Sequence, residues 1–492
     1  MRLKVKNLGL SSGGPLIVVI NSNDAKSGGL NALDRVKIIY GSKEVIAVVN
    51  IASNQNVNIG EIGLFDEVID KISIRKGSFV DVEYENKPLS LGYIKDKLNG
   101  KRLNEKQINE IIDNIVKNKI SEVEASYFIA GIYTHGLDDN EIFYMTKAIA
   151  SEGKPVNWGK KIVLDKHSSG GTAGNRTTMI IVPIIAAAGF CILKTSSRAI
   201  TSASGTADVM EVLAKVSFPV SKIKEIVNKT NGCMVWGGTL DLANADDRLI
   251  KIEKTLSLDP EGALLSSVLS KKKAVGATHV LIDIPYGEGA KINDKNKAKR
   301  LKKQFIKIGK RLGMKMKVIL TDGSEPIGNG IGPSLEARDV LKVLRCEEDA
   351  PEDLKEKSVM MAGLMLEMVG HGDEKTALEI LESGEAYKKM KEIIKAQGGN
   401  ENVKPDNIKI GKYSHVIESK KNGIVRRIDN MGINKIARFS GAPGDKGAGV
   451  YLFVHKGYYV NKGDKLFAVY SNDSNKLKYG LKLLKNEIIS VG

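Results

Sequence analysis

A segment rich in glycines and hydroxyl side chains, residues 165–178, has the composition of an anion-binding loop. It reads Asp-Lys-His-Ser-Ser-Gly-Gly-Thr-Ala-Gly-Asn-Arg-Thr-Thr, follows a strand-like apolar run and precedes the helix-like stretch Met179 to Ala188. Glycines let the backbone come close to a ligand, and the start of a helix presents unpaired N–H groups and the positive end of a dipole. The sequence lacks the Gly-Lys-Ser/Thr ending of a Walker loop. We interpret this first loop as a phosphate site; a plain strand-to-helix turn is the alternative.

A second polar loop, residues 194–208, follows the first after one helix-length apolar stretch. It reads Lys-Thr-Ser-Ser-Arg-Ala-Ile-Thr-Ser-Ala-Ser-Gly-Thr-Ala-Asp and is dense in serine and threonine. A stretch of this kind is usually a polar surface loop or a set of helix caps. Two loops that each follow a strand of one parallel sheet, however, lie at the same edge, where ligands bind. Their succession therefore predicts one anion site built from both loops.

The motifs of both loops resemble those of the thymidine/pyrimidine-nucleoside phosphorylase family, and most closely its archaeal AMP phosphorylase branch. The family pattern Lys-His-Ser-x-Gly-Gly is matched at Lys166 to Gly171, and the branch form of the second loop at residues 194–208. Further matches are Trp236-Gly-Gly, Asp259-Pro260, Ser267-Val-Leu-Ser-Lys-Lys and Ala396-Gln-Gly-Gly. The resemblance runs from about Leu89 to the C-terminus, and a β-rich N-terminal extension is itself a mark of the branch.

The resemblance implies a role for each matched residue. Inorganic phosphate would be bound by Lys166, Ser168, Thr178 and Ser196, together with Thr206. Nucleotide contacts would fall on Gly171, Ser197, Arg198, Ala199, Ile200, Thr201, Ser202, Thr206, Ser267 and Lys291, and in the wider family Ser267 and Lys271 face the base. Arg198 and Lys291 are the cations that we expect at a 5′-phosphate. Asp259 matches the branch's proton donor and His167 is the alternative acid; Asp259 could instead only cap the helix that begins at Pro260.

The reaction implied is AMP + phosphate ⇌ adenine + ribose 1,5-bisphosphate, with other nucleoside 5′-monophosphates as further substrates and no cofactor. Pyrimidine-specific members read the base with an arginine shortly before the Ser-x-x-x-Lys helix, whereas no arginine lies between Leu249 and Ser270 here. That departure weakens the closest alternative, a thymidine or uridine phosphorylase. A phosphoribosyltransferase of the related fold would need a pyrophosphate–magnesium site. A basic nucleic-acid-binding protein is the alternative from another class, and it predicts salt-sensitive binding without phosphorolysis.

The elements that position these residues predict a multidomain α/β protein. Residues 1–86 have the alternation of a β-rich domain, 87–155 have helical periodicity, 156–400 alternate strands with helices, and 401–492 form a C-terminal α+β domain. Further helices near 210–275 are expected to join the helical domain. Within the last region, Gly457-x-x-Val-x-x-Gly-Asp-x-Leu resembles a lipoyl-like hairpin, but it lacks a Met-Lys pair to modify. The resemblance further implies closure of the helical and α/β domains on substrate, and a homodimer or larger homo-oligomer.

Composition sets the remaining bounds. The net charge is +17, which fits either a lysine-rich solvated surface or an anionic partner; runs at 271–273, 295–303 and 388–395 carry much of it. The three cysteines are widely spaced and the six histidines show no metal-ligand spacing, so we expect neither a disulfide framework nor a metal site. No apolar run is long enough for a membrane helix. We therefore expect a cytoplasmic enzyme that binds neither membrane nor nucleic acid.

Overall fold

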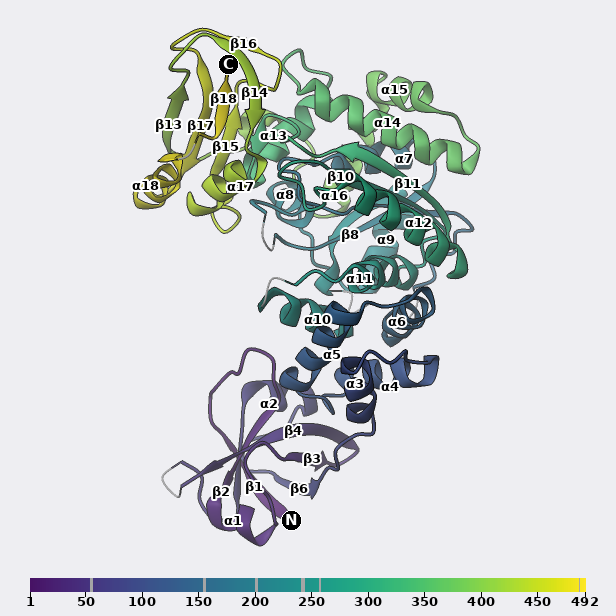
Figure 1. The fold of residues 1–492 in the computed structure, drawn as a ribbon, viewed down its shortest axis with the longest axis vertical. Helices are drawn as coiled ribbons and strands as arrows, with labels where there is room; N and C mark the ends of the chain where they lie inside the picture. The colour runs from purple at the N-terminus through teal and green to yellow at the C-terminus, as the bar shows by residue number, and fades with distance from the viewer. Residues whose placement is uncertain (54–55, 154–155, 200–201, 240–243, 256–257, 486) are drawn as a thin grey trace. The chain divides into compact units, whose positions relative to one another are not determined.

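The computed structural model describes residues 1–492 except 54–55, 154–155, 200–201, 240–243, 256–257 and 486. The chain groups into two compact units, Met1–Gly153 with Ala243–Ser270, and Lys154–Leu242 with Lys271–Gly492. The first unit holds a barrel and a helical bundle, and the second holds a parallel sheet and the C-terminal region (Figure 1). The predicted multidomain α/β class is therefore confirmed. None of the helices that the structure describes is long and apolar enough to cross a membrane.

The N-terminal strands close into a barrel in the order β1-β5-β2-β4-β3-β6. Alternating apolar residues such as Val36 and Ile38 point into its core, as the alternation predicts. The strands are β1 (Arg2–Asn7), β2 (Ile17–Asn21), β3 (Arg35–Tyr40), β4 (Lys43–Ala52), β5 (Glu61–Leu64) and β6 (Phe79–Tyr84), with short helices α1 (Ser22–Ser27) and α2 (Asp66–Ile72).

The helical bundle combines segments that are far apart in the sequence. Its helices are α3 (Ser90–Leu98), α4 (Glu105–Val116), α5 (Glu122–His135), α6 (Asp139–Glu152) and α10 (Asn244–Thr255), and α11 (Glu261–Ala274) begins in the same unit. Ser121 and Glu124 form a capping box at the start of α5. The isoleucine stripe of α4 packs in a core that also contains Ala245 and Leu249 of α10.

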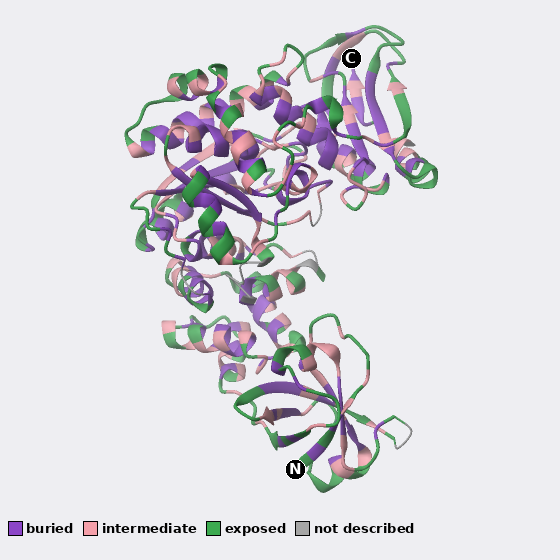
Figure 2. Ribbon diagram, turned by 180° about the vertical axis from the view of Figure 1, so that it is seen from behind, coloured by how far each residue is buried: buried purple, intermediate pink, exposed green. Residues whose placement is uncertain are grey.

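Five parallel strands form the sheet of the second unit, in the order β11-β10-β7-β8-β9. The apolar runs of β7, β8 and β10 are buried on both faces because helices cover the sheet, as Figure 2 shows, whereas the edge strand β11 is largely half-buried. The strands are β7 (Val163–Ser168), β8 (Cys191–Ser196), β9 (Gly232–Trp236), β10 (His279–Tyr286) and β11 (Lys315–Asp322). The helices are α7 (Thr178–Ala187), α8 (Thr206–Leu213), α9 (Val220–Thr230), α12 (Lys295–Arg311), α13 (Pro333–Leu344), α14 (Glu352–Val369), α15 (Glu374–Glu382) and α16 (Glu385–Ala396), with a 3-10 turn at Gly237–Thr239.

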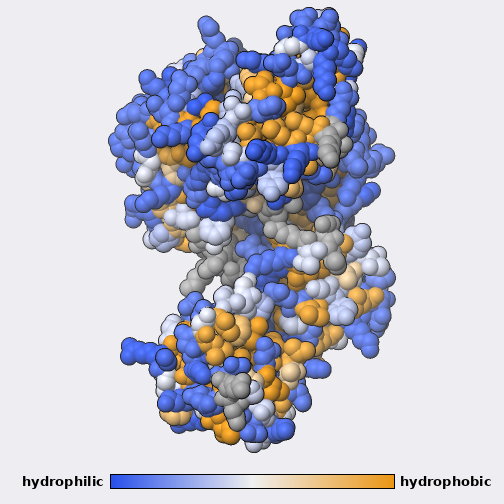
Figure 3. Space-filling view, turned by 90° about the vertical axis from the view of Figure 1, so that its left-hand side faces the viewer, coloured by the Kyte–Doolittle hydropathy of each residue, from blue (hydrophilic) through white to orange (hydrophobic). Residues whose placement is uncertain are grey.

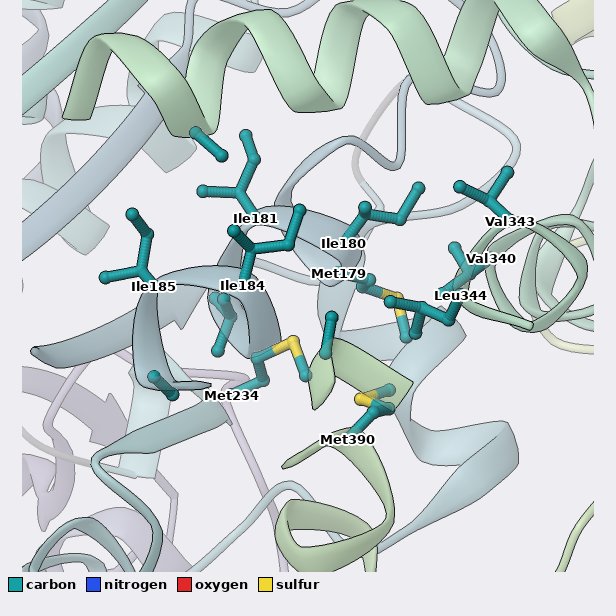
Figure 4. Close-up of a cluster of buried hydrophobic side chains, with 14 of the residues drawn as sticks. Met179, Ile180, Ile181, Ile184, Ile185, Met234, Val340, Val343, Leu344 and Met390 are labelled. Carbon is teal, nitrogen blue, oxygen red and sulfur yellow. The ribbon is translucent and has the colours of Figure 1, made fainter. Parts of the chain in front are cut away.

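The core of this unit surrounds α7. Its isoleucines pack against Met234 of β9, Met390 of α16 and the valines of α13 (Figure 4). Burying a side chain of this size stabilises the fold by roughly 1.5–3 kcal/mol. This core fixes the direction of α7 and hence the position of the first loop, which leads into it. Hydrophilic side chains cover most of the surface seen in Figure 3, in keeping with the high charge.

The C-terminal region folds into two small sheets, ordered β12-β15-β17-β13 and β16-β14-β18. The strands are β12 (Gly330–Ile331), β13 (Tyr413–Glu418), β14 (Gly423–Ile428), β15 (Gly449–Leu452), β16 (Tyr459–Val460), β17 (Lys465–Ser471) and β18 (Ile489–Val491). The helices are α17 (Asn430–Phe439) and α18 (Ser474–Leu481), with 3-10 turns at Pro405–Asn407 and Lys482–Lys485. β12 belongs to the segment just before α13 and pairs with β15 of the C-terminal region. This pairing connects the C-terminal region to the segment that precedes α13.

Candidate anion-binding site

The parallel sheet brings both polar loops to one edge. β8 and β9 extend the sheet to one side of β7 and β10 lies on the other, so the chain order reverses between β7 and β10. In open parallel sheets, ligands bind beside the carboxyl ends of the strands at such a switch point. β7 ends at Ser168 and β8 at Ser196, so the first and second loops leave the sheet there.

Arg176 of the first loop links the two loops directly. Its guanidinium donates to Thr206 Oγ1 at 3.2 Å and to the Ser204 carbonyl at 2.7 Å. It also forms an ion pair with the buried Glu336 of α13, which in turn accepts from Ser204 Oγ. The two loops therefore meet at one edge of the sheet, as their succession predicts.

Lys166 is a buried cation at the end of β7. Its side chain is 1% exposed, and Nζ donates to Thr177 Oγ1 at 2.9 Å and lies 3.5 Å from Thr178 Oγ1. Burial lowers the pKa of Lys166 to about 7; the carboxylate of Asp283 opposes the shift and the charge of Lys357 adds to it. The low pKa means that nearby carboxylates do not fully balance the charge of the Lys166 ammonium. A bound anion would supply the missing counter-charge.

Asp283 is the buried carboxylate on the adjacent strand β10. Its Oδ2 accepts from Ser168 Oγ at 3.2 Å and lies 3.3 Å from Lys357 Nζ, while Oδ1 accepts from Thr321 Oγ1 at 2.6 Å. Burial acts to raise the pKa of Asp283, but the charges of Lys357 and Lys166 outweigh it and leave the pKa below its ordinary value. Asp283 is thus ionised and orients the hydroxyl of Ser168.

A second buried ion pair lies on the other side of β7. Lys272 Nζ is 2.7 Å from Asp165 Oδ2, and Lys194 Nζ donates to the Lys166 carbonyl at 2.9 Å. Burial and the charge of Lys272 hold the pKa of Lys194 well below its ordinary value. Among the described residues, four lysines (166, 194, 272 and 357) thus cluster around two carboxylates (165 and 283). Lysines outnumber carboxylates here, so a bound anion would supply counter-charge and favour the ammonium form of these lysines.

His167 follows Lys166 on β7. Burial, together with the charges of Lys272, Lys194 and Lys166, holds its pKa well below the ordinary histidine value. Its imidazole is therefore neutral at pH 7 and able to donate or accept a hydrogen bond. A neutral imidazole is a poor acid, which weakens His167 as the alternative proton donor.

The first loop also contains polar atoms that the protein leaves unsatisfied. Ser169 Oγ and Thr172 Oγ1 are buried and have no hydrogen-bond partner among the described residues. Gly170 between them has φ +85°, and a Cβ there would meet nothing within 4 Å. Buried hydroxyls without a protein partner are rare, and these two can donate hydrogen bonds to a bound anion. Both residues belong to the hydroxyl-rich pattern, but the family motifs do not single them out.

Lys291 lies beside the first loop. A Cβ on Gly171, which has φ +97°, would come within 2.4 Å of the Lys291 backbone nitrogen. The segment 287–292, which we call the Lys291 loop, therefore packs directly on Gly171, and only glycine fits this contact. The Lys291 side chain is exposed. Its position next to the first loop suits a cation that contacts an anionic group near that loop.

Arg198, the other cation expected at a 5′-phosphate, is already engaged. Its guanidinium makes a two-pronged contact with Glu211 at 2.8 and 2.7 Å, lies 3.3 Å from Asp208 and stacks 5.3 Å from the Trp236 ring centroid. The hydrogen bond to Glu211 raises the pKa of Arg198. Its charge is thus largely neutralised in this conformation.

The remaining second-loop residues differ in their hydrogen bonds and in their exposure. The Ala199 N–H donates to Asp208 Oδ2 at 2.7 Å, and Ser202 Oγ donates to the Ser204 carbonyl at 3.0 Å. Ser197 is exposed and Ser196 is half-buried at the end of β8. Ile200 and Thr201 lie outside the described residues.

Asp259 and Ser267 belong to the first unit and are described within it. Asp259 is exposed just before α11. Ser267 Oγ donates to Asp246 Oδ2 at 2.9 Å, and Lys271 follows one turn later on the same face of α11. Arg248, the arginine directly before the arginine-free stretch, donates to the Ile115 carbonyl inside the bundle. Arg248 is therefore held by the bundle backbone.

Several site residues were not predicted. Arg176 stands in the first loop, yet its pairing with Glu336 depends on a contact 160 residues away. Asp283 could have been found as the lone charge in the apolar strand Val280 to Ile284. The run at 271–273 fits a solvated surface, which is wrong for Lys272, because Lys272 is 2% exposed and paired with Asp165. Within the described part of the chain, no group of three or more His, Cys, Asp or Glu could hold a metal ion.

Models of known families match three parts of the chain. A glycosyl transferase family a/b domain matches residues 160–387, a glycosyl transferase family helical bundle domain matches 91–153, and a pyrimidine nucleoside phosphorylase C-terminal domain matches 424–490. The AMP phosphorylase of Methanocaldococcus jannaschii is 46% identical over 95% of this chain and 93% of its own. That of Thermococcus kodakarensis is 44% identical over 99% and 96%. The chain belongs to the AMP phosphorylase family.

A further relative and a solved structure are also similar to this chain. A Legionella pneumophila relative, provisionally named a thymidine phosphorylase, is 41% identical over 100% of this chain and 95% of its own. The crystal structure of anthranilate phosphoribosyltransferase from Thermus thermophilus matches with a TM-score of 0.53 and 18% identity, covering 62% of this chain and 98% of that one. The likeness to that transferase shows a shared fold alone.

Proposed function

We propose that this protein catalyses the phosphorolysis of AMP, giving adenine and ribose 1,5-bisphosphate. The observation that carries the proposal is the buried lysine cluster at the sheet switch point, where Lys166 has a pKa of about 7 and two loop hydroxyls have no partner among the described residues. Full-length relatives named AMP phosphorylase support the choice of nucleotide. The protein is then a pentosyltransferase that acts in nucleotide breakdown.

Phosphate is the nucleophile in this reaction. We assign it to Lys166, Ser168, Thr178 and Ser196, with Thr206 at the start of α8. In the unliganded protein the Ser168 hydroxyl donates to Asp283. When phosphate binds, the hydroxyl gives up this hydrogen bond and donates to a phosphate oxygen instead. The oxocarbenium-like ribose that forms as the C1′–N bond breaks is stabilised by the facing dianion. A phosphate oxygen then forms the new bond to C1′.

The leaving base takes the electron pair of the broken bond and needs a proton. We assign this proton to Asp259, in line with the branch motif and with the depressed pKa of His167. Ser267 and Lys271, one turn apart on α11, are assigned to the base edge. Lys291 is assigned to the 5′-phosphate, because its loop packs on Gly171 of the first loop.

The direct test incubates AMP with phosphate and measures free adenine, with adenosine and thymidine as parallel substrates. We expect adenine to appear only when phosphate is present, and kcat/KM for AMP to exceed that for adenosine. Faster cleavage of thymidine would instead support the pyrimidine-nucleoside alternative. A requirement for added Mg²⁺ and a pyrophosphorylated sugar would favour a phosphoribosyltransferase, and no base release from any of these substrates would overturn the proposal.

A further inference from the structure

Two asparagines of the C-terminal region, Asn430 and Asn434, contact the backbone of both polar loops. They stand one helical turn apart at the start of α17. Asn430 Oδ1 accepts from the Ala173 N–H of the first loop at 2.8 Å, and Asn434 Oδ1 accepts from the Ala203 N–H of the second loop at 3.1 Å. Ala173 and Ala203 are also buried in the core of the C-terminal region. Each loop is thus held at one alanine, by a hydrogen bond and by burial.

Asn430 also reaches the Lys291 loop. Its Nδ2 donates to the Gly171 carbonyl at 2.5 Å and to the Gly289 carbonyl at 3.1 Å. The orientation of the amide is unambiguous, because the Ala173 N–H needs an acceptor and the two carbonyls need a donor. The residue is 1% exposed, so water does not compete for these three bonds. A single side chain therefore joins the first loop to the segment that carries Lys291.

We propose that Asn430 and Asn434 are positioning residues for phosphorolysis, which hold the first, second and Lys291 loops in fixed mutual positions before substrate binds. This inference rests on the proposed function. Loops that are ordered in advance lose less conformational entropy when the anion binds. A bound phosphate itself bridges the first and second loops, so at saturation it restores much of the arrangement. Loss of an asparagine should therefore weaken phosphate binding more than it lowers kcat.

The test compares Asn430→Ala and Asn434→Ala with the unaltered enzyme in phosphate titrations at saturating AMP. Three buried hydrogen bonds are lost in Asn430→Ala, so we expect KM for phosphate to rise roughly tenfold or more. Asn434→Ala removes one loop bond, and a rise of about fivefold is expected. In both, kcat should fall less than about threefold, since the bound anion reorders the loops.

Gln397→Ala is the matched control. Gln397 is also fully buried and makes a similar set of bonds: it donates to the Lys215 and Met234 carbonyls at 2.7 and 2.9 Å, and it accepts from the Met234 N–H at 3.0 Å and from the Cys233 thiol at 3.7 Å. Among the described residues, its side chain makes no hydrogen bond to the first, second or Lys291 loop. We expect its loss to lower Tm while KM for phosphate stays unchanged.

Equal KM changes in Asn430→Ala and Gln397→Ala, or none in either asparagine variant, would overturn the inference. If Asn430→Ala does not fold, Asn434→Ala decides alone. An unaltered enzyme that releases no adenine would reject the proposed function instead. Calorimetric titration with inorganic phosphate, which needs no turnover, would then still test whether the asparagines set anion affinity.

Discussion

The pKa of Lys166 makes a specific prediction about how anion affinity depends on pH. In the unliganded protein Lys166 is protonated only below about pH 7. An anion in contact with Nζ stabilises the ammonium and raises its pKa, so binding takes up a proton above pH 7. Affinity should therefore be full below pH 7 and fall as pH rises through this value. The pH dependence of folding has the opposite sign: between about pH 7 and the ordinary lysine pKa, stability rises with pH, because the unfolded chain there binds more protons than the folded one.

The magnitude follows from the size of the shift. Each pH unit above the free pKa costs about 1.4 kcal/mol of binding free energy, which is roughly tenfold in Kd. Because half of Lys166 is already deprotonated at pH 7, the dissociation constant should rise roughly fiftyfold between pH 7 and pH 9. Inorganic phosphate titrates in the same range, whereas sulfate stays a dianion, so sulfate is the cleaner probe. Calorimetric titration with sulfate in buffers of different ionisation enthalpy would give both Kd and the number of protons taken up.

Two variants locate the effect. Lys166→Met removes the titrating group, so the remaining sulfate affinity should be nearly independent of pH. Lys357→Met removes a cation that repels Lys166 and frees Asp283 to pair with it, so the midpoint should move to higher pH. A sulfate Kd that changes less than about threefold between pH 6.5 and 9 in the unaltered protein would refute the reasoning, since a titrating ammonium requires a far larger change.

Three further predictions concern the other assigned residues. Lys291→Ala should lower kcat/KM for AMP by roughly ten- to a hundredfold, the value of one hydrogen bond to a charged group, and leave adenosine cleavage nearly unchanged; equal losses on both would disprove the 5′-phosphate role. Asp259→Asn should lower kcat by about a hundredfold or more while His167→Ala has the smaller effect on kcat, and the reverse order in single-turnover assays would make His167 the acid. Gly171→Ala should raise KM for AMP, because its Cβ would displace the Lys291 backbone. Gly170→Ala, whose Cβ meets open space, is the control there; a similar change in KM in both variants would point to backbone strain alone.

The parts of the site that follow local rules could be predicted from the sequence. Strand β7, the hydroxyl-rich first loop and helix α7 come in that order because an apolar run, glycines and a second apolar run follow one another. The meeting of both loops at one edge follows from the parallel sheet. The ion pair between Arg176 and Glu336 could not be predicted, because nothing near Arg176 in the sequence indicates a partner in α13. Asn430 was missed for the same reason, since its partner Ala173 lies 257 residues away.

The burial of Lys272 could not be predicted from the sequence either. A run such as Lys271 to Lys273 usually marks a solvated helix face, and the pattern does not distinguish the one lysine that turns inward. Lys272 is buried because Asp165 stands at the matching level of β7 and neutralises it at 2.7 Å. Burial of a lone charge is unfavourable, so the pair must be recognised together. A single sequence gives no sign that residues 165 and 272 are partners.

The helical bundle is completed by residues that the ribosome delivers late. α10 supplies Ala245 and Leu249 to the bundle core, yet β7, β8 and β9 of the other unit are synthesised before it. A fragment that ends near residue 153 would thus expose the apolar face of α4 and α5 that α10 covers. Residues 154–242, which belong to the other unit, are synthesised before α10 can complete the bundle core. The two units therefore cannot fold strictly one after the other during synthesis. Attempts to produce the bundle alone should graft residues 243–270 onto its end.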